Sequence, residues 1–226
     1  MKTTIHSLHW ENMDQRIVEA QRKVFEKFEL PINYTKGNYP HGAWMNYICK
    51  NTDSELFIFF DADCVPIDRE IVDESVAYAI ENNSFVGLAQ ASNHIPPYSH
   101  VFAAPAFFVI TKSCYEQLGS PTFSETSRSD VAQEVSYIAE EKRKRYKCLY
   151  PTKFDGVPVE GVWRLSNYGL YGIGTLFQDR VYHLYQGRFN HNVELFVKRC
   201  QQIYGGKFDV TEMHDSLKTF NGRIVP

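Results

Sequence analysis

The sequence predicts an α/β fold with a mostly parallel central sheet flanked by helices. In its first half, short apolar stretches alternate with segments that repeat apolar residues at helical spacing. One stretch, Leu56–Phe60, is apolar throughout, which is typical of a central strand covered on both faces. The chain of 226 residues shows neither repeats nor a long linker. We therefore expect a single domain over residues 1–226, with a core over about 3–204 and a tail over 205–226.

The first half divides into alternating elements. Strands are predicted where apolar and β-branched residues cluster, and helices where one face is apolar, as with Ile17, Val24 and Phe28. The expected order is strand Thr3–Leu8, helix Met13–Phe28, strand Pro31–Thr35, loop Lys36–Gly42, helix Ala43–Lys50, strand Leu56–Phe60, a helix capped by Asp68 with Ile80 facing inward, strand Phe85–Gln90, strand Ala106–Thr111 and a helix ending at Gly119.

The second half contains fewer clear signals. Ser129–Arg145 reads as a helix with Val131, Val135 and Ile138 on one side. Val181–Leu184 reads as a late strand. The expected last helix carries a stripe of Val193, Phe196, Val197, Cys200 and Tyr204.

Composition excludes several classes of protein. With 24 basic and 27 acidic residues the formal charge is −3, whereas general nucleic-acid binders and membrane-surface binders are basic. The longest apolar stretch, Val101–Ile110, is about half of a membrane span, and the first residues do not resemble a signal peptide. Five cysteines without a CxxC argue against a disulfide scaffold or a zinc ribbon. We expect a cytoplasmic protein.

Two aspartates follow directly on the apolar strand. Asp61 and Asp63 are separated by one residue, so in extended backbone both side chains point to the same side. Neighbouring carboxylates repel each other, and a divalent cation would offset that cost; oxygen ligands suit Mg²⁺ or Mn²⁺. Ligands of parallel sheets bind beyond the carboxyl ends of the strands, which favours a binding site here. The alternative is that the acids only mark a turn or cap the next helix.

Asp61-Ala62-Asp63-Cys64-Val65 resembles motifs of two families. One is the haloacid-dehalogenase-like phosphatases, which would make Asp61 a nucleophile, although in that family the motif usually lies on the first strand. The other is the nucleotide-sugar glycosyltransferases of the GT-A fold, a Rossmann-like fold in which Asp-x-Asp ends a strand after a βαβα half. The order of elements over roughly residues 3 to 200 is similar to that family. A third possibility is a non-catalytic module that binds a nucleotide or a glycan.

The GT-A resemblance implies a metal-dependent transfer of a sugar from a UDP- or GDP-sugar to a hydroxyl. Asp61 and Asp63 would hold the donor diphosphate through Mn²⁺ or Mg²⁺. Many members carry a histidine as a third ligand near the end of the core, and His183 in Val181–Tyr185 fits that position. The alternative for His183 is a histidine packed within a strand.

In inverting members an acid at the start of a helix is the general base, and Asp130 matches that position. Glu134, one turn later, is the second candidate. The alternative interpretation of Asp130 is structural, because Ser127-Arg128-Ser129-Asp130 also matches a capping box.

Contacts to the donor are expected at several other positions. The resemblance places the nucleoside near the end of the first strand and in the loop Lys36–Gly42, and it places the sugar near Gln90. Arg188 would pair with phosphate, unless it is only a solvated surface residue. The candidate donor contacts, besides the two aspartates, are His6, Ser7, Gly37, Ala62, Gln90 and Arg188.

One basic run, Lys142–Lys147, stands out in this acidic chain. It is the solvated end of a helix or a docking patch for an anionic acceptor such as DNA with modified bases. The acceptor is thus open between a glycan, a protein and a DNA base. A chain of this size could also form an oligomer.

Overall fold

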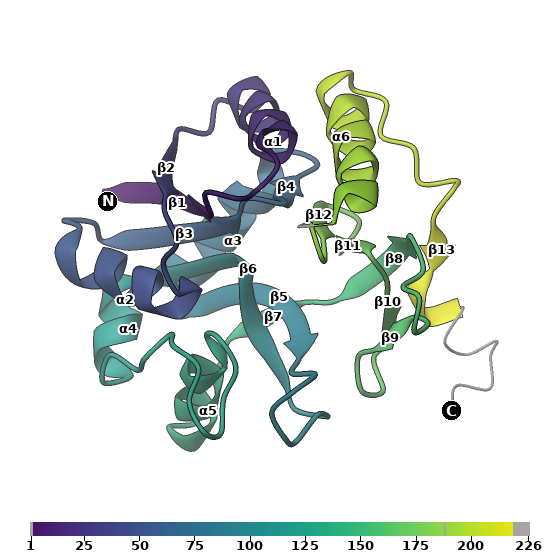
Figure 1. The fold of residues 1–226 in the computed structure, drawn as a ribbon. Helices are drawn as coiled ribbons and strands as arrows, with labels where there is room; N and C mark the ends of the chain where they lie inside the picture. The colour runs from purple at the N-terminus through teal and green to yellow at the C-terminus, as the bar shows by residue number, and fades with distance from the viewer. Residues whose placement is uncertain (1, 188, 219–226) are drawn as a thin grey trace. The chain divides into compact units, whose positions relative to one another are not determined.

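The computed structural model describes residues 2–187 and 189–218, and it confirms an α/β fold (Figure 1). The chain divides into two compact units built from alternating segments. The first unit comprises Met1–Glu11, Pro31–Asp61 and Val72–Leu149, and the second comprises Asn12–Leu30, Ala62–Ile71 and Tyr150–Pro226. The single domain over residues 1–226 stays a prediction.

The first unit contains a six-stranded sheet in the order β2-β1-β3-β6-β5-β7. β1 pairs in parallel with β2 and β3, and β5 pairs in parallel with β7. Only β6 runs against its neighbours β3 and β5, so the predicted mixed, mostly parallel sheet is confirmed. Its strands are β1 (Thr3–His9), β2 (Ile32–Lys36), β3 (Leu56–Asp61), β5 (Phe85–Ala91), β6 (Val101–Thr111) and β7 (Lys147–Leu149).

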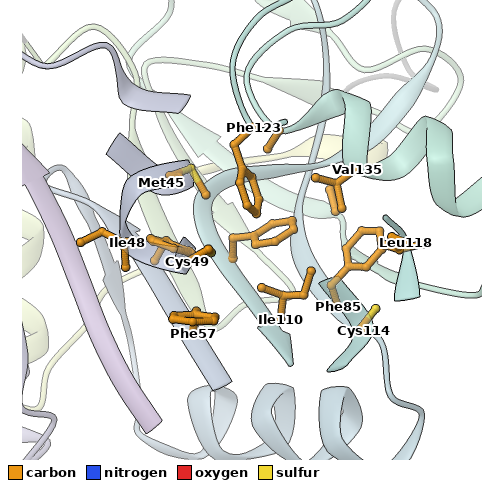
Figure 2. Packing of buried hydrophobic residues seen from close by; sticks show 14 of the residues in the cluster. Met45, Ile48, Cys49, Phe57, Phe85, Ile110, Cys114, Leu118, Phe123 and Val135 are labelled. Atoms are coloured by element: carbon orange, nitrogen blue, oxygen red, sulfur yellow. The ribbon is translucent and has the colours of Figure 1, made fainter. Parts of the chain in front are cut away.

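The core of the first unit is dominated by aromatic rings (Figure 2). Phe57 and Phe59 on β3 point to the same face because residues two apart alternate to one side of a strand. Phe123 lies against Phe59 and meets Phe108 edge-on, at ring distances of 6.1 and 5.7 Å. This packing explains why Leu56–Phe60 reads as a continuous apolar run.

Helices α2 (His41–Asn51), α4 (Lys112–Gln117), α5 (Gln133–Glu141) and most of α3 (Glu70–Glu81) belong to the first unit. In α3 the Asp68 carboxylate accepts from the Ile71 N–H, as expected of a cap. The prediction that Ile80 faces inward is wrong, since 42% of this residue is exposed.

The predicted helix over Ser129–Arg145 is longer than α5. Ala132, just before the helix, has a left-handed backbone with φ of 66°, and the Gln133 side chain accepts from the Asp130 N–H. At the other end Arg143 has φ of 54°, so the helix stops at Glu141. The capping-box interpretation of Ser127–Asp130 is therefore wrong, because this segment precedes the helix by several residues.

The second unit contains a five-stranded antiparallel sheet in the order β13-β8-β11-β12-β4. Of its strands, the sequence predicted only β12 (Val181–Leu184). Helices α1 (Gln15–Lys27) and α6 (Asn190–Tyr204), both expected, lie side by side in this unit (Figure 1). The other strands are β4 (Cys64–Pro66), β8 (Pro151–Asp155), β11 (Gly174–Phe177) and β13 (His214–Asp215), with a separate ribbon of β9 (Trp163–Arg164) and β10 (Leu170–Tyr171).

A buried ion pair between Arg199 and Asp155 connects three elements of the second unit. Arg199 on α6 is 1% exposed, and its Nε donates to Asp155 Oδ2 on β8 at 2.8 Å. The Tyr182 hydroxyl on β12 donates to the other carboxylate oxygen of Asp155 at 3.1 Å. One helix and two strands are thus joined through a single carboxylate. In neither unit does a described helix have the length and apolar character required to cross a membrane.

Candidate functional site

Asp61 ends β3 in the first unit, opposite Leu8 of the parallel strand β1. β1, β2 and β3 run in the same direction, so their carboxyl ends lie at one edge of the sheet. The Asp61 side chain is 27% exposed, and its Oδ1 lies 3.3 Å from Nε2 of His41, the first residue of α2. The first predicted carboxylate therefore lies at the sheet edge where ligands of parallel sheets bind.

Asp63 belongs to the second unit, where it directly precedes β4. β4 pairs antiparallel with β12, and this register sets His183 opposite Cys64. As a result, Nε2 of His183 lies 3.6 Å from Oδ1 of Asp63. The Leu184 N–H also donates to the Asp63 carbonyl at 2.9 Å. The pairing of two short strands thus brings together a carboxylate and an imidazole that are far apart in sequence.

Gly187, in the loop after β12, packs closely against Asp63. A Cβ at position 187 would lie 2.6 Å from Asp63 Oδ2 and 3.3 Å from the Ile17 side chain. Any other residue would have to displace the carboxylate, so glycine preserves the space beside Asp63. The neighbouring candidate Arg188 lies outside the described residues.

The two candidate bases have different surroundings in the first unit. Asp130 Oδ1 accepts from the Val131 N–H, and Oδ2 lies 3.8 Å from Nδ1 of His94. Glu134, in the first turn of α5, accepts from Arg128 Nε at 3.1 Å, and this hydrogen bond lowers the pKa of the Glu134 carboxyl. A carboxylate held ionised by a guanidinium is a weaker proton acceptor, which favours Asp130.

His94, Asp130 and Glu125 offer nearby metal-ligating atoms within the first unit. His94 Nε2 lies 3.4 Å from Glu125 Oε2. His94 and Glu125 are mostly solvated, with side chains 49% and 55% exposed. His94 and Glu125 thus form the immediate environment of Asp130.

The candidate donor contacts are mostly buried. β1 extends one residue beyond the predicted Thr3–Leu8, to His9, so His6 and Ser7 lie within the strand; their exposures are 6% and 0%. His6 Nε2 is 2.9 Å from Thr4 Oγ1, and burial lowers the pKa of the His6 imidazole.

The remaining candidates are distributed over both units. Ala62 is 1% exposed. Gln90, near the end of β5, is half-buried. The N–H of Gly37 donates to the His9 carbonyl, and a Cβ at Gly37 would lie 2.4 Å from the Tyr39 ring. A larger residue at position 37 would therefore have to move the exposed Tyr39 ring.

Two lysines of the basic run Lys142–Lys147 form hydrogen bonds within the first unit. Lys142 Nζ donates to the carbonyls of Gln117 and Leu118 at the end of α4, and Lys144 Nζ donates to the Gln117 side chain. Arg143 and Arg145 are exposed. These contacts support the interpretation of Lys142 and Lys144 as residues that stabilise a helix end, where cations are favoured.

Sequence reasoning missed two residues beside the aspartates, His41 and Gly187. His41 falls within the predicted loop Lys36–Gly42, whereas in the structure it is the first residue of α2, and nothing in its local sequence points to Asp61. A group of rings lies around His183: Tyr185 lies 4.2 Å from the imidazole and contacts Trp163 and Tyr171 at 5.5 and 5.3 Å.

Neither a protein-family profile nor a curated protein matches the chain. Among solved structures, a protein from STIV has a TM-score of 0.41 at 12% identity, covering 81% of this chain and 94% of that one. TarS 1–349 of S. aureus has a TM-score of 0.43 at 12% identity, covering 65% of this chain and 57% of TarS 1–349. A mutant of Drosophila β1,4-galactosyltransferase 7, in complex with manganese, UDP-Gal and xylobiose, has a TM-score of 0.45 at 7% identity, covering 66% and 65%.

Proposed function

We propose that this chain is a metal-dependent glycosyltransferase that moves a sugar from a nucleoside-diphosphate sugar, a UDP- or GDP-sugar, to an acceptor hydroxyl. The observation that carries the proposal is the position of His183, 3.6 Å from the Asp63 carboxylate. Asp63 is separated by one residue from Asp61, which ends a buried strand of a mostly parallel sheet. Carboxylates that follow such a strand, and an imidazole beside one of them, are ligand types that bind divalent cations in proteins.

The donor set fits a divalent cation. Asp61, Asp63 and His183 would hold Mn²⁺ or Mg²⁺, and the imidazole favours Mn²⁺. The space beside Asp63 supports this assignment, because Gly187 leaves out the side-chain atom that would press on the carboxylate. When bound, the cation neutralises the charge that develops on the leaving diphosphate.

The chain's own acids supply the proton transfer. In an inverting reaction Asp130 takes the proton of the acceptor hydroxyl, and Glu134 is the second candidate because Arg128 already binds it. In a retaining reaction another carboxylate or the donor itself assists, and Gln90 lines the sugar. His6, Ser7, Gly37, Ala62, Gln90 and Arg188 remain the proposed donor contacts. The acceptor is a glycan, a protein or a modified DNA base.

The test is hydrolysis of UDP- and GDP-sugars by the purified chain, with Mn²⁺ and with EDTA. We expect turnover only with the metal, and a loss of more than about 100-fold in Asp63→Asn. Asp53→Asn is the matched control, since the Asp53 side chain is 97% exposed, and it should behave as wild type. Metal-independent turnover, or full activity in Asp63→Asn, would contradict the proposal.

The two alternatives predict different results in the same preparation. A haloacid-dehalogenase-like phosphatase would release phosphate from p-nitrophenyl phosphate, and Asp61→Asn would abolish this activity because Asp61 would be the nucleophile. A binding module would bind the donor without turnover on any acceptor. Either result would replace the glycosyltransferase proposal.

A further inference from the structure

His41 faces Asp61 and was not expected to do so. Its Nε2 lies 3.3 Å from Asp61 Oδ1, and both side chains are partly buried, with exposures of 20% and 27%. We propose that His41 is a positioning residue, which holds the Asp61 carboxylate in the orientation that binds the divalent cation. This proposal rests on the proposed function, because it gives Asp61 the role of a metal ligand.

The His41 ring is held in place by its neighbours. It stacks on the Trp44 ring, one turn later in α2, at 5.8 Å and an interplanar angle of 29°. Trp44 is 4% exposed and meets Phe59 of β3 edge-on at 5.6 Å. The indole N–H donates to Thr35 Oγ1 at 3.2 Å, so the surface on which His41 rests is itself fixed.

The backbone of the same turn has little room to move. A Cβ at Gly42 would lie 2.3 Å from the Phe123 carbonyl oxygen, so the first turn of α2 packs directly against the backbone of another segment of the first unit. The backbone of His41 is therefore held by the packing of the first turn of α2, and its ring is held by stacking on Trp44. A residue that positions a metal ligand needs its own side chain to be fixed in this way.

The direction of the contact follows from the chemistry of its partners. With a hydrogen on Nε2, the His41 ring can donate to Asp61 Oδ1, which a carboxylate oxygen can accept. The contact engages one carboxylate oxygen and limits rotation of the group. Outer contacts of this kind typically change metal affinity by roughly 10–100-fold.

The experiment measures Mn²⁺ binding alone, by electron paramagnetic resonance of the free ion, on the full chain without donor. His41→Phe keeps a ring for stacking on Trp44 and removes the N–H donor, whereas His41→Gln keeps a donor without the ring. We expect His41→Phe to weaken Mn²⁺ binding by roughly 10-fold or more, and His41→Gln to retain more of the affinity. The melting temperature of each variant checks that it folds.

The chain offers a matched control. His100 also lies against a carboxylate, 3.0 Å from Glu140, and stacks on Tyr137 at 4.2 Å. His100→Phe removes the same kind of contact at another position, and should bind Mn²⁺ as wild type does.

The outcomes separate the two proposals. Wild-type affinity in His41→Phe, together with weakened binding in Asp63→Asn, would overturn the role of His41 and leave the proposed function standing. Absence of Mn²⁺ binding in the wild type would contradict the metal site, and the proposed function with it. A folded His41→Phe with weakened binding, beside an unchanged His100→Phe, supports the positioning role.

Discussion

The two units of this protein fill their interiors in different ways. Both units bury aromatic rings, such as Phe57 in the first unit and Phe154 and Phe196 in the second, all at 0% exposure. The second unit also buries a guanidinium, that of Arg199, which is 1% exposed and pairs with Asp155. Apolar contacts are non-directional, whereas a buried ion pair is stable only when its hydrogen bonds have good geometry.

This difference bears on the candidate site. Tyr182, which donates to Asp155, directly precedes His183 on β12. We infer that the directional network fixes the position of β12, and so of the imidazole beside Asp63. In contrast, Asp61 ends β3, a strand that pairs in parallel with β1 and packs in the apolar core of the first unit.

The largest expected effect is on the ion pair. Arg199→Met leaves the Asp155 charge buried without its partner, and we expect a loss of about 3–5 kcal/mol in the free energy of unfolding, measured with urea. The double variant Arg199→Met/Asp155→Leu removes both charges and should recover most of that loss. An additive double variant would show that Arg199 stabilises the unit by packing, for example on Phe208, and not through its charge.

A smaller effect is expected in the apolar core of the first unit. Ile110→Val removes one buried methylene group and should cost about 0.5–1.5 kcal/mol. The loss should be similar between pH 5 and 8, because the cluster around Ile110 is apolar. If Ile110→Val lowered the free energy of unfolding as much as Arg199→Met does, the proposed difference between the two interiors would be wrong.

The smallest expected effect lies on the surface of the first unit. The Arg128 hydrogen bond lowers the pKa of Glu134 below its ordinary 4.5, so its contribution to stability is present above that value and is lost as the pH falls through the lower, folded-state pKa. Since the Arg128 side chain is 50% exposed, Glu134→Gln should cost less than about 1 kcal/mol at pH 7. Urea unfolding should show this difference shrinking in acid; a difference that grew in acid would contradict the assignment.

The sequence predicts the first sheet and the helices of both units better than the second sheet, for a physical reason. Strand β3 of the first unit and helices α1 and α6 of the second carry local patterns, either an apolar run or a stripe at helical spacing, that identify them without their partners. The strands of the second sheet are short and partly polar, as in Pro151–Asp155. Their pairing joins segments as distant as Cys64–Pro66 and Val181–His183, so long-range contacts define them.

The candidate site follows the same rule. Asp61 and Asp63 are conspicuous because they follow a buried strand, and His183 is conspicuous only through the resemblance to a family. The proximity of His41 to Asp61, and of Gly187 to Asp63, arises from tertiary packing. Neither contact could be predicted from a local pattern, because each joins residues that are far apart in the sequence.

The central claim is that Asp63 and His183 bind one divalent cation, and calorimetric titration with Mn²⁺ tests it most directly. His183→Gln should fold as wild type by circular dichroism and bind Mn²⁺ at least about 10-fold more weakly. His214→Gln is the control, because His214 is exposed on β13 of the same unit. We expect one Mn²⁺ per wild-type chain and, of the two variants, weakened binding in His183→Gln alone; equal binding by wild type and His183→Gln would contradict the metal site.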